Sequence, residues 1–152
     1  MVDIQYNKTL AILGAGGFGR EMETWISQSK VINEYNSIVY LDDNLNSLDN
    51  YDSDYKIIDI ISLSSLRKTK NVLVAISNKD VRKVIFDYFK NEGGFNIISF
   101  IHSTCLQGKF SKIGLGFIAT ANTIVSCNTV IGDGVFINSG SQVGHDVVIG
   151  NY

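Results

Sequence analysis

Short apolar runs alternate with more polar stretches through the first hundred residues of the chain. The runs TLAIL (9–13), SIVYLDD (37–43), NVLVAIS (71–77) and NIISFI (96–101) each have the length and composition of a buried strand. Strands separated by helical segments in so short a stretch are typical of a parallel sheet covered by helices. The pattern therefore predicts an α/β domain over residues 1–101.

Two helices are predicted between these strands, because apolar residues recur on one helical face in each segment. The first helix follows a glycine-rich turn and buries Met22, Trp25 and Ile26. The polar stretch DDNLNSLDNYDSDYK (42–56) is predicted to be a surface loop. The buried face of the second helix is predicted to comprise Val81, Val84, Ile85, Tyr88 and Phe89.

After residue 101 the apolar pattern changes to a period of six. An α-helix cannot use this period, and the alternating strands of a sandwich would give a period of two. A solenoid can, because three hexads close one triangular coil and every sixth side chain points into its interior. The sequence therefore predicts a partial β-helix over residues 102–152, with a little over two coils. Its interior positions are Ile113, Ala119, Val125, Ile131, Ile137, Val143 and Ile149.

Composition and charge narrow the functional classes. Apolar residues make up 45% of the 152-residue chain, and the formal net charge of −2 argues against a nucleic-acid surface. No apolar run reaches the roughly 18 residues of a membrane span, and no signal-peptide pattern is present, so a cytoplasmic protein is expected. Cys105 and Cys127 lack the spacing of a zinc site, so they are expected to be buried free thiols, and no metal is expected. The basic cluster LRKTK (66–70) is expected to be a solvated loop.

The stretch GAGGFG lies between a predicted strand and a predicted helix. It matches the phosphate-binding pattern GxGxxG at Gly14, Gly16 and Gly19, and Gly17 belongs to the same turn. Glycine lets the backbone approach a phosphate, and the helix N-terminus offers free N–H groups to it. A tight turn without a ligand, an NAD site and a site for one nucleotide all remain open. A full dinucleotide fold needs about six strands, and fewer are predicted here, which favours one nucleotide.

Two acids, Asp42 and Asp43, end the second predicted strand about 20 residues after the glycines, where a carboxylate can accept hydrogen bonds from ribose hydroxyls. The candidate substrate-binding residues are therefore Gly14, Gly16, Gly17, Gly19, Asp42 and Asp43.

A histidine lies in the last part of the chain, in the sequence VGHDVVIG. Histidine can act as a general base at neutral pH, and the neighbouring Asp146 could hold the ring of His145 in one tautomer. Because Val143 is an interior position, His145 is expected on a turn outside the solenoid. The alternative is an exposed turn histidine without a chemical role. The other histidine, His102, is interpreted as a capping or junction residue.

Five segments carry a family resemblance: LAILGAGGFGREM (10–22), VYLDD (39–43), VAISN (74–78), FIHST (100–104) and IGDGVFINSGSQVGHDVVIG (131–150). In this order they resemble the hexapeptide-repeat sugar acetyltransferases of the sialic-acid O-acetyltransferase and bacillosamine N-acetyltransferase type. The resemblance implies a Rossmann-like half domain followed by a left-handed parallel β-helix.

The resemblance also implies a reaction. Acetyl-CoA would be the co-substrate, and a nucleotide-activated amino sugar or sialic acid would accept the acetyl group directly on an amino or hydroxyl group. His145 would be the general base, with Asp146 orienting it and Asn138 near the acceptor group. The glycine turn and the two acids would hold a uridine diphosphate, and the protein would form a homotrimer. Relatives often have a histidine where this chain has Phe18, which cannot donate a hydrogen bond to the substrate.

The last residues, IGNY, begin a further hexad. Relatives of this type continue for several coils, which supply most of the acetyl-CoA groove and the trimer surface. The chain is therefore expected to be a truncated form that folds in its N-terminal half and has little or no activity alone. A non-catalytic nucleotide-sugar-binding module is the alternative function, and a small NAD-binding domain is the third.

Overall fold

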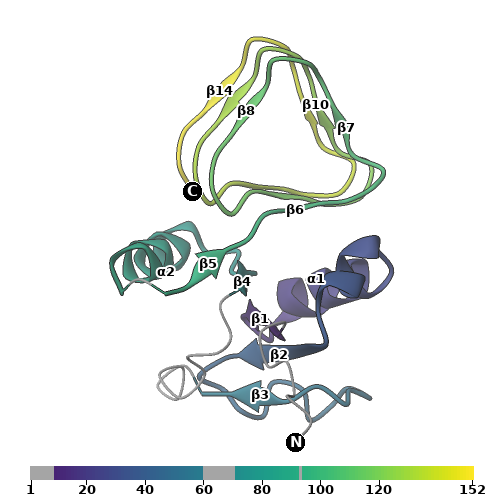
Figure 1. The fold of residues 1–152 in the computed structure, drawn as a ribbon, viewed down its shortest axis with the longest axis vertical. Helices are drawn as coiled ribbons and strands as arrows, with labels where there is room; N and C mark the ends of the chain where they lie inside the picture. Colours follow the sequence, from purple (N-terminus) through teal and green to yellow (C-terminus); the bar gives the residue numbers. More distant parts are fainter. Residues whose placement is uncertain (1–8, 60–70, 93) are drawn as a thin grey trace, which may run out of the picture.

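The computed structural model describes residues 9–59, 71–92 and 94–152. It consists of an α/β domain and a three-sided coil that stands on one edge of the domain's sheet (Figure 1). The basic cluster at 66–70 lies outside the described residues, so the expectation of a solvated loop is not tested. Within the described ranges, no helix has both the length and the apolar character needed to cross a membrane.

The α/β domain contains a five-stranded parallel sheet with the order β3-β2-β1-β4-β5. The strand predicted over 96–101 is in fact two strands, because only its first part pairs in this sheet. The sequence pattern also missed β3, which has only two residues. The strands are β1 (Thr9–Leu13), β2 (Ser37–Leu41), β3 (Ile57–Ile58), β4 (Asn71–Val74) and β5 (Asn96–Ile97).

Two helices cover opposite faces of this sheet. Helix α1 (Gly17–Ser27) packs on the face that carries Leu10 and Ile12 of β1, whereas α2 (Lys79–Glu92) packs on the face that carries Ala11 and Leu13. Alternate residues of a strand point to opposite faces, so both faces of β1 are apolar and buried. A short 3₁₀ helix, η2 (Lys30–Glu34), follows α1. The predicted buried face of α1 is confirmed, with Met22 and Ile26 inaccessible and Trp25 partly buried.

Helix α2 is confirmed, but its predicted buried face is only partly right: Phe89 is buried and Ile85 is partly buried, whereas Phe86 was not predicted. Val81, Val84 and Tyr88 are exposed, and the residues that pack inward are Phe86 and Phe89. Two aromatic rings bury more area than two valines, and Phe86 also meets the ring of Tyr152 in the coil at 5.5 Å. The helix is therefore rotated toward its aromatic residues.

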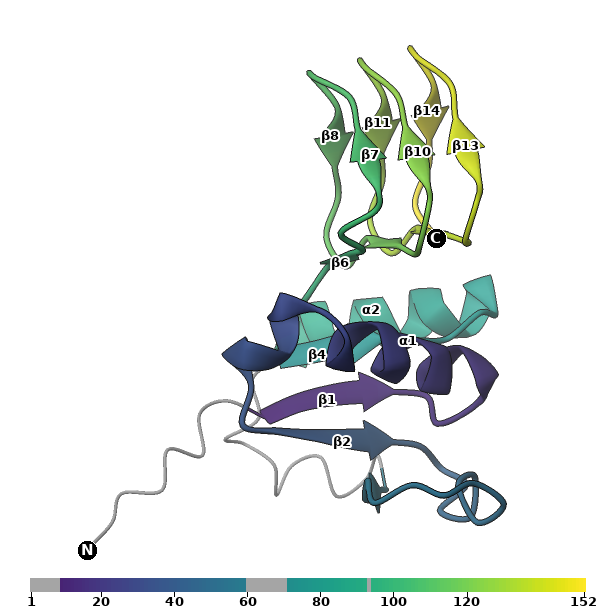
Figure 2. The same ribbon diagram turned by 90° about the vertical axis from the view of Figure 1, so that its right-hand side faces the viewer.

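The second part of the chain is a left-handed parallel β-helix (Figure 1). Its three sheets have the orders β12-β9-β6, β13-β10-β7 and β14-β11-β8, so three coils are stacked (Figure 2). The strands are β6 (Phe100–Ile101), β7 (Leu106–Gln107), β8 (Lys112–Ile113), β9 (Ile118–Ala119), β10 (Ile124–Val125), β11 (Val130–Ile131), β12 (Phe136–Ile137), β13 (Gln142–Val143) and β14 (Val148–Ile149).

The hexad register is confirmed, but the number of coils is larger than expected. Ala119, Val125, Ile131 and Ile137 are buried in one interior cluster, against which Ile113, Val143 and Ile149 are partly buried. The first coil begins at β6, before the first hexad that the sequence revealed. Gln107 occupies an equivalent position in β7, and this polar residue concealed the earlier start.

From Phe110 onward, one residue of each hexad has a left-handed backbone conformation, which turns the chain at a corner. Seven of these residues and the final tyrosine follow a strict step of six: Phe110, Gly116, Asn122, Asn128, Gly134, Gly140, Asp146 and Tyr152. Glycine, asparagine and aspartate tolerate this conformation best, so the polar and small residues between the apolar positions have a backbone reason for their spacing.

Phe110 is an aromatic residue at one of these left-handed positions, and its replacement should increase the stability of the protein. Its φ is 66° and its side chain is 81% exposed, so the phenyl ring contributes little burial to offset an unfavourable backbone conformation. The Phe110→Asn variant is expected to be more stable than the parent by about 1 kcal/mol, measured as the free energy of unfolding in urea. Phe110→Ala, which has no such tolerance, should give a clearly smaller gain, and equal gains would contradict this explanation.

The two parts of the chain share one hydrophobic core. Phe100 of β6 and Ile118 of β9 belong to the same buried cluster as Leu10 and Ile12 of β1. An ion pair between Lys90 of α2 and Asp133 in a turn of the coil adds a polar contact, with Nζ and Oδ2 2.6 Å apart. The coil therefore rests on the α/β domain through apolar packing.

The Lys90–Asp133 pair gives the interface a pH dependence. The hydrogen bond from Lys90 and that from the Leu115 N–H lower the pKa of Asp133 below its ordinary value. Its stabilising contribution is therefore present above the unfolded-state pKa of about 4 and is lost as the pH falls through the lower, folded-state pKa. Asp133→Asn should reduce the free energy of unfolding at pH 7 by about 1 kcal/mol, because the pair is partly exposed.

The control for this variant is Asp87→Asn, which removes the exposed Lys83–Asp87 pair within α2. Urea denaturation at pH 7 should show a smaller loss for Asp87→Asn than for Asp133→Asn. The difference between Asp133→Asn and the parent should shrink below pH 4. A difference that is constant from pH 7 to pH 3 would show that the carboxylate charge does not contribute.

Both cysteines are free thiols, as expected, but the expectation that both are buried is wrong. Cys105 is partly buried against the interior of the coil, whereas Cys127 is exposed. Cys127 lies two residues after the interior position Val125, which places it on a turn.

Candidate active site

The glycine turn follows β1 and begins α1, and two of its glycines are required by close packing. Gly14 has a φ of 103°, and a Cβ at this residue would lie 2.8 Å from the carbonyl oxygen of Ala75. A Cβ at Gly19 would lie 1.8 Å from the carbonyl oxygen of Gly14. The turn therefore closes on itself and on the end of β4, as the GxGxxG pattern predicts.

The other two glycines face open space. No atom lies within 4 Å of a Cβ built at Gly16, and the nearest to one at Gly17 is an Arg20 nitrogen at 3.9 Å. Gly16 is also the N-cap of α1, no side chain caps that helix, and no acidic residue lies in its first turn. The exposed backbone here has room for an anion close to free N–H groups.

The two candidate acids have different environments. Asp42 supports the turn, because its Oδ2 accepts a hydrogen bond from the Ala15 N–H at 2.7 Å and its Oδ1 accepts one from the Asn44 N–H at 2.9 Å. Asp43 is exposed. The structure thus brings Asp42 to the glycine turn and gives it a structural task that sequence reasoning did not foresee, while its role toward a ribose stays a prediction.

Phe18, which lies within the glycine turn, has a packing role in this structure. Its ring packs on Phe136 of β12 with centroids 4.7 Å apart, so it connects the glycine turn to the coil. Arg82 of α2, which is 5% exposed, lies over the other end of this contact, with its guanidinium carbon 5.2 Å from the Phe136 centroid. An apolar ring at residue 18 thus contributes to the joint between the two parts of the chain.

Arg82 is a residue that sequence reasoning missed. Its Nη1 donates to the carbonyl oxygens of Ile76 and Ser77 at 2.6 and 2.9 Å, immediately after β4. Its Nε is buried and has no hydrogen-bond partner among the described residues, and burial lowers the pKa of the guanidinium. Arg82 therefore adds a buried positive charge beside the segment that packs against Gly14. From sequence alone, an arginine in a helix is expected to be exposed to solvent, so no pattern predicted that Arg82 is buried.

The histidine of the last turns is paired with its neighbour. His145 Nδ1 lies 2.6 Å from Asp146 Oδ2, and both side chains are exposed, on the turn after β13. The hydrogen bonds from His145 and from Asn128 lower the pKa of Asp146, so its carboxylate stays charged at neutral pH. A charged carboxylate on Nδ1 favours the tautomer that leaves Nε2 free to accept a proton.

Asn128 completes this arrangement and was not predicted. Its Nδ2 donates to Asp146 Oδ1 at 3.0 Å from the coil below, and the Asp146 N–H donates to the Cys127 carbonyl oxygen at 3.1 Å. Asn128 precedes Asp146 by 18 residues, one full coil, and both have a left-handed φ. The signal in the sequence was therefore this 18-residue step, which stacks Cys127 under His145 in the same way.

Asn138 lies at another corner of the coil. It follows β12, whereas His145 follows β13, and its Oδ1 accepts a hydrogen bond from the Ser139 N–H at 2.9 Å. Among the described residues no hydrogen bond connects Asn138 with the His145–Asp146 pair, and none connects the pair with the glycine turn. The role expected for Asn138 stays a prediction.

His102 is a junction residue, as interpreted from the sequence. Its Nδ1 accepts a hydrogen bond from the Thr104 N–H at 3.2 Å, and its ring meets Trp25 of α1 edge-on at 5.1 Å. It therefore connects the first turn of the coil with α1. In the part of the chain that the structure describes, no cluster of His, Cys, Asp and Glu could hold a metal ion.

Known structures share this architecture over nearly the whole chain. The acetyltransferase domain of PglB from Neisseria gonorrhoeae, solved in complex with acetyl coenzyme A, is 27% identical, with a TM-score of 0.81; the match covers 95% of this chain and 68% of that one. PerB from Caulobacter crescentus, solved with CoA and GDP-perosamine, is 20% identical (TM-score 0.78; 92% and 64% covered). WeeI from Acinetobacter baumannii is 23% identical (TM-score 0.79; 93% and 66% covered).

Two family models match the two parts of the chain separately. Residues 128–152 match the bacterial transferase hexapeptide model, which describes six repeats. Residues 9–89, more than half of the chain, match the model of the PglD N-terminal domain. The chain therefore belongs to the family defined by the PglD N-terminal domain, which is joined here to transferase hexapeptide repeats.

Proposed function

We propose that the chain is an acetyltransferase that moves an acetyl group from acetyl-CoA to an amino or hydroxyl group of a nucleotide-activated amino sugar, with His145 as the general base. The observation that carries the proposal is the His145–Asp146 pair on an outward turn of the β-helix. The similar PglB domain is an acetyltransferase solved with acetyl coenzyme A, and PerB was solved with CoA and a nucleotide-linked sugar. Acetyl-CoA as co-substrate follows from these likenesses, and a cytoplasmic location is proposed with it.

The pair provides proton transfer for a direct reaction. The nitrogen or oxygen of the acceptor forms a bond to the acetyl carbon, and the carbon–sulfur bond of the thioester breaks. His145 Nε2 takes the proton that the acceptor loses, while the ionised Asp146 stabilises the imidazolium that results. The departing thiolate of coenzyme A is then reprotonated, from the imidazolium or from water. Asn128 holds the second oxygen of Asp146, so the carboxylate keeps its orientation during this cycle.

The glycine turn is the proposed site for the nucleotide diphosphate. Open space at Gly16 and Gly17, an uncapped helix N-terminus and the buried charge of Arg82 all favour an anion. Asp42 already accepts two backbone hydrogen bonds, so the exposed Asp43 is the better candidate for ribose hydroxyls. Asn138 is proposed to contact the acceptor group.

A homotrimer is proposed as the assembled form. Val130 and Val148 stack on the outer face of one sheet of the coil and are 39% and 74% exposed, which is unusual for aligned valines of a monomer. Burial of this face against another copy would shield it. Sedimentation equilibrium tests the state: a mass of three chains supports the proposal, and a single-chain mass at all concentrations contradicts it.

Calorimetry and turnover together test the function. The chain is titrated with a uridine or guanosine diphosphate amino sugar, with acetyl-CoA and with NADH, and release of free coenzyme A thiol is followed with both substrates present. Binding of both substrates with thiol release supports the acetyltransferase. Binding of the sugar nucleotide without coenzyme binding or turnover would instead identify a non-catalytic binding module, and NADH binding would identify the third candidate.

A further inference from the structure

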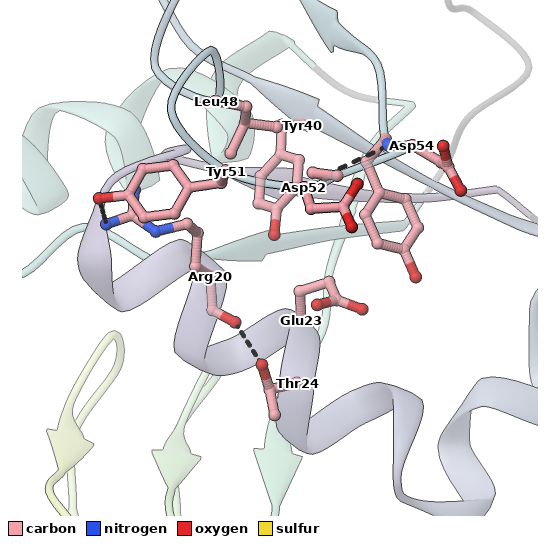
Figure 3. Close-up of a pocket in the computed structure, with 10 residues that line it drawn as sticks. Arg20, Glu23, Thr24, Tyr40, Leu48, Tyr51, Asp52 and Asp54 are labelled. Carbon is pink, nitrogen blue, oxygen red and sulfur yellow. Dashed lines mark hydrogen bonds between the residues drawn. The ribbon is translucent and has the colours of Figure 1, made fainter.

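A cavity in the α/β domain lies beside the glycine turn but shares no lining residue with the proposed active site. Helix α1, the loop that follows β2 and the side chain of Tyr40 line a half-open space of about 440 Å³ (Figure 3). Its lining includes none of the turn glycines and neither Asp42 nor Asp43. The cavity lies beside β2, which is separated from the edge strand β5 by β1 and β4.

The cavity carries an excess of negative charge. Glu23 of α1 and Asp52 and Asp54 of the loop line it, against one cation, Arg20. The guanidinium of Arg20 is already engaged: Nη1 donates to the Ala15 carbonyl oxygen at 3.0 Å, Nη2 donates to the Tyr51 hydroxyl at 2.9 Å, and the group lies 3.8 Å from the Tyr51 ring centroid. Arg20 therefore holds part of the cavity wall in place. The three carboxylates make the electrostatic potential in the cavity negative.

The hydroxyl of a buried tyrosine points into this space. Tyr40 is 1% exposed, and its hydroxyl extends from β2 into the cavity near Glu23 (Figure 3). No hydrogen bond from this hydroxyl to any described residue is found, so it is available to a group in the cavity. Burial, followed by the charge of Glu23, raises the pKa of Tyr40, which keeps the phenol protonated. The cavity thus presents a hydrogen-bonding group to a ligand.

The residues that line the cavity favour an organic cation over a metal ion. In the described part of the chain the carboxylates do not converge as a metal ion would require. They are spread around a cavity of molecular size whose walls include the rings of Tyr51 and Tyr55. Separate carboxylates, hydroxyls and aromatic faces suit an ammonium group on a small polar carbon skeleton.

We propose that this cavity is a binding site for a small organic ammonium compound with hydroxyl groups, of the size of an amino sugar. The ammonium group is bound by the carboxylates of Glu23 and the 52–54 loop, and a ligand hydroxyl pairs with Tyr40. This site is separate from the nucleotide site proposed at the glycine turn.

The test uses glucosamine as the cationic probe and N-acetylglucosamine as its uncharged counterpart, in NMR titrations of the 152-residue chain. Glucosamine is expected to shift the amide resonances of Thr24 and Ser53, and N-acetylglucosamine to bind at least about tenfold more weakly. Glu23→Gln should raise the glucosamine Kd by about tenfold or more, and Tyr40→Phe, which keeps the ring, by about three- to tenfold.

Matched controls are Glu34→Gln in η2 and Tyr88→Phe in α2, both at exposed positions away from the cavity, which should leave the Kd unchanged. Thermal unfolding checks that each variant is folded, and the affinity for the sugar nucleotide should be the same in Tyr40→Phe as in the parent. Equal binding of the two probes, shifts confined to the glycine turn, or no shift at all would overturn the proposal. Loss of this site would leave the acetyltransferase proposal standing, because the two sites share no residue.

Discussion

Replacement of His145 by asparagine is expected to lower kcat for acetyl transfer by about 10²- to 10⁴-fold, with little change in the KM for either substrate. The side chain is exposed, so its loss should not affect folding. The reason for the kinetic effect is that Nε2 is the proposed proton acceptor, and asparagine cannot accept that proton. Steady-state release of coenzyme A thiol from acetyl-CoA, with a nucleotide-linked amino sugar as acceptor, measures the change.

Three further variants separate the base from its surroundings. Asp146→Asn should also lower kcat, because the amide cannot stabilise the imidazolium, but by less than the loss of the base itself. His102→Asn should leave kcat near the parent value, since His102 contacts Trp25 and Thr104 at the junction. Cys127→Ser tests the direct route: an inactive Cys127→Ser would indicate a covalent acetyl-cysteine under His145. Full activity of His145→Asn would exclude the proposed mechanism.

Replacement of Gly19 by alanine is expected to reduce the free energy of unfolding by at least about 3 kcal/mol. The new methyl group would lie 1.8 Å from the Gly14 carbonyl oxygen, which is backbone and cannot rotate away. Either α1 must shift from β1 or the turn must open, and both changes disturb the buried cluster that contains Met22 and Ile26. Urea denaturation followed by circular dichroism measures the loss.

Gly16→Ala is the matched control for this prediction. Its Cβ meets no atom within 4 Å and its φ of −71° suits any residue, so the free energy of unfolding should fall by less than about 1 kcal/mol. The same methyl group occupies the space proposed for the diphosphate, so the Kd for the sugar nucleotide should rise in calorimetry. Equal stability losses in the two variants, or an unchanged Kd in Gly16→Ala, would contradict these assignments.

Much of the fold could be predicted because its patterns follow from backbone geometry. The interior positions of the coil were identified in register, since each hexad must bury one side chain in the same place. The first coil escaped detection because Gln107 interrupts the apolar step, and β3 escaped because two residues carry too little pattern. The buried face of α2 was predicted only in part, because its valines and its phenylalanines define different faces and tertiary packing on Tyr152 decides between them.

The candidate site was predictable where the chemistry is local in sequence. The glycine turn and the His145–Asp146 pair consist of residues near one another in the chain. Asn128 reaches its position through the stacking of coils, and Arg82 through the packing of α2. Contacts between separate elements of this kind cannot be recognised from the neighbouring sequence. The tyrosine-lined cavity was missed for the same reason, because it forms only when the 42–56 loop folds beside α1.

The 18-residue period of the coil also determines how far along the coil axis a side chain lies. Residues 109, 127 and 145 occupy one corner in successive coils, and adjacent strands of a sheet are about 4.8 Å apart. Moving a histidine and its acidic neighbour by 18 positions would therefore displace the proton acceptor by one such spacing along the axis, with no change of orientation. Because the coil is joined to the glycine turn through a shared core, the choice of coil would select which atom of a sugar held at the proposed nucleotide site comes within reach.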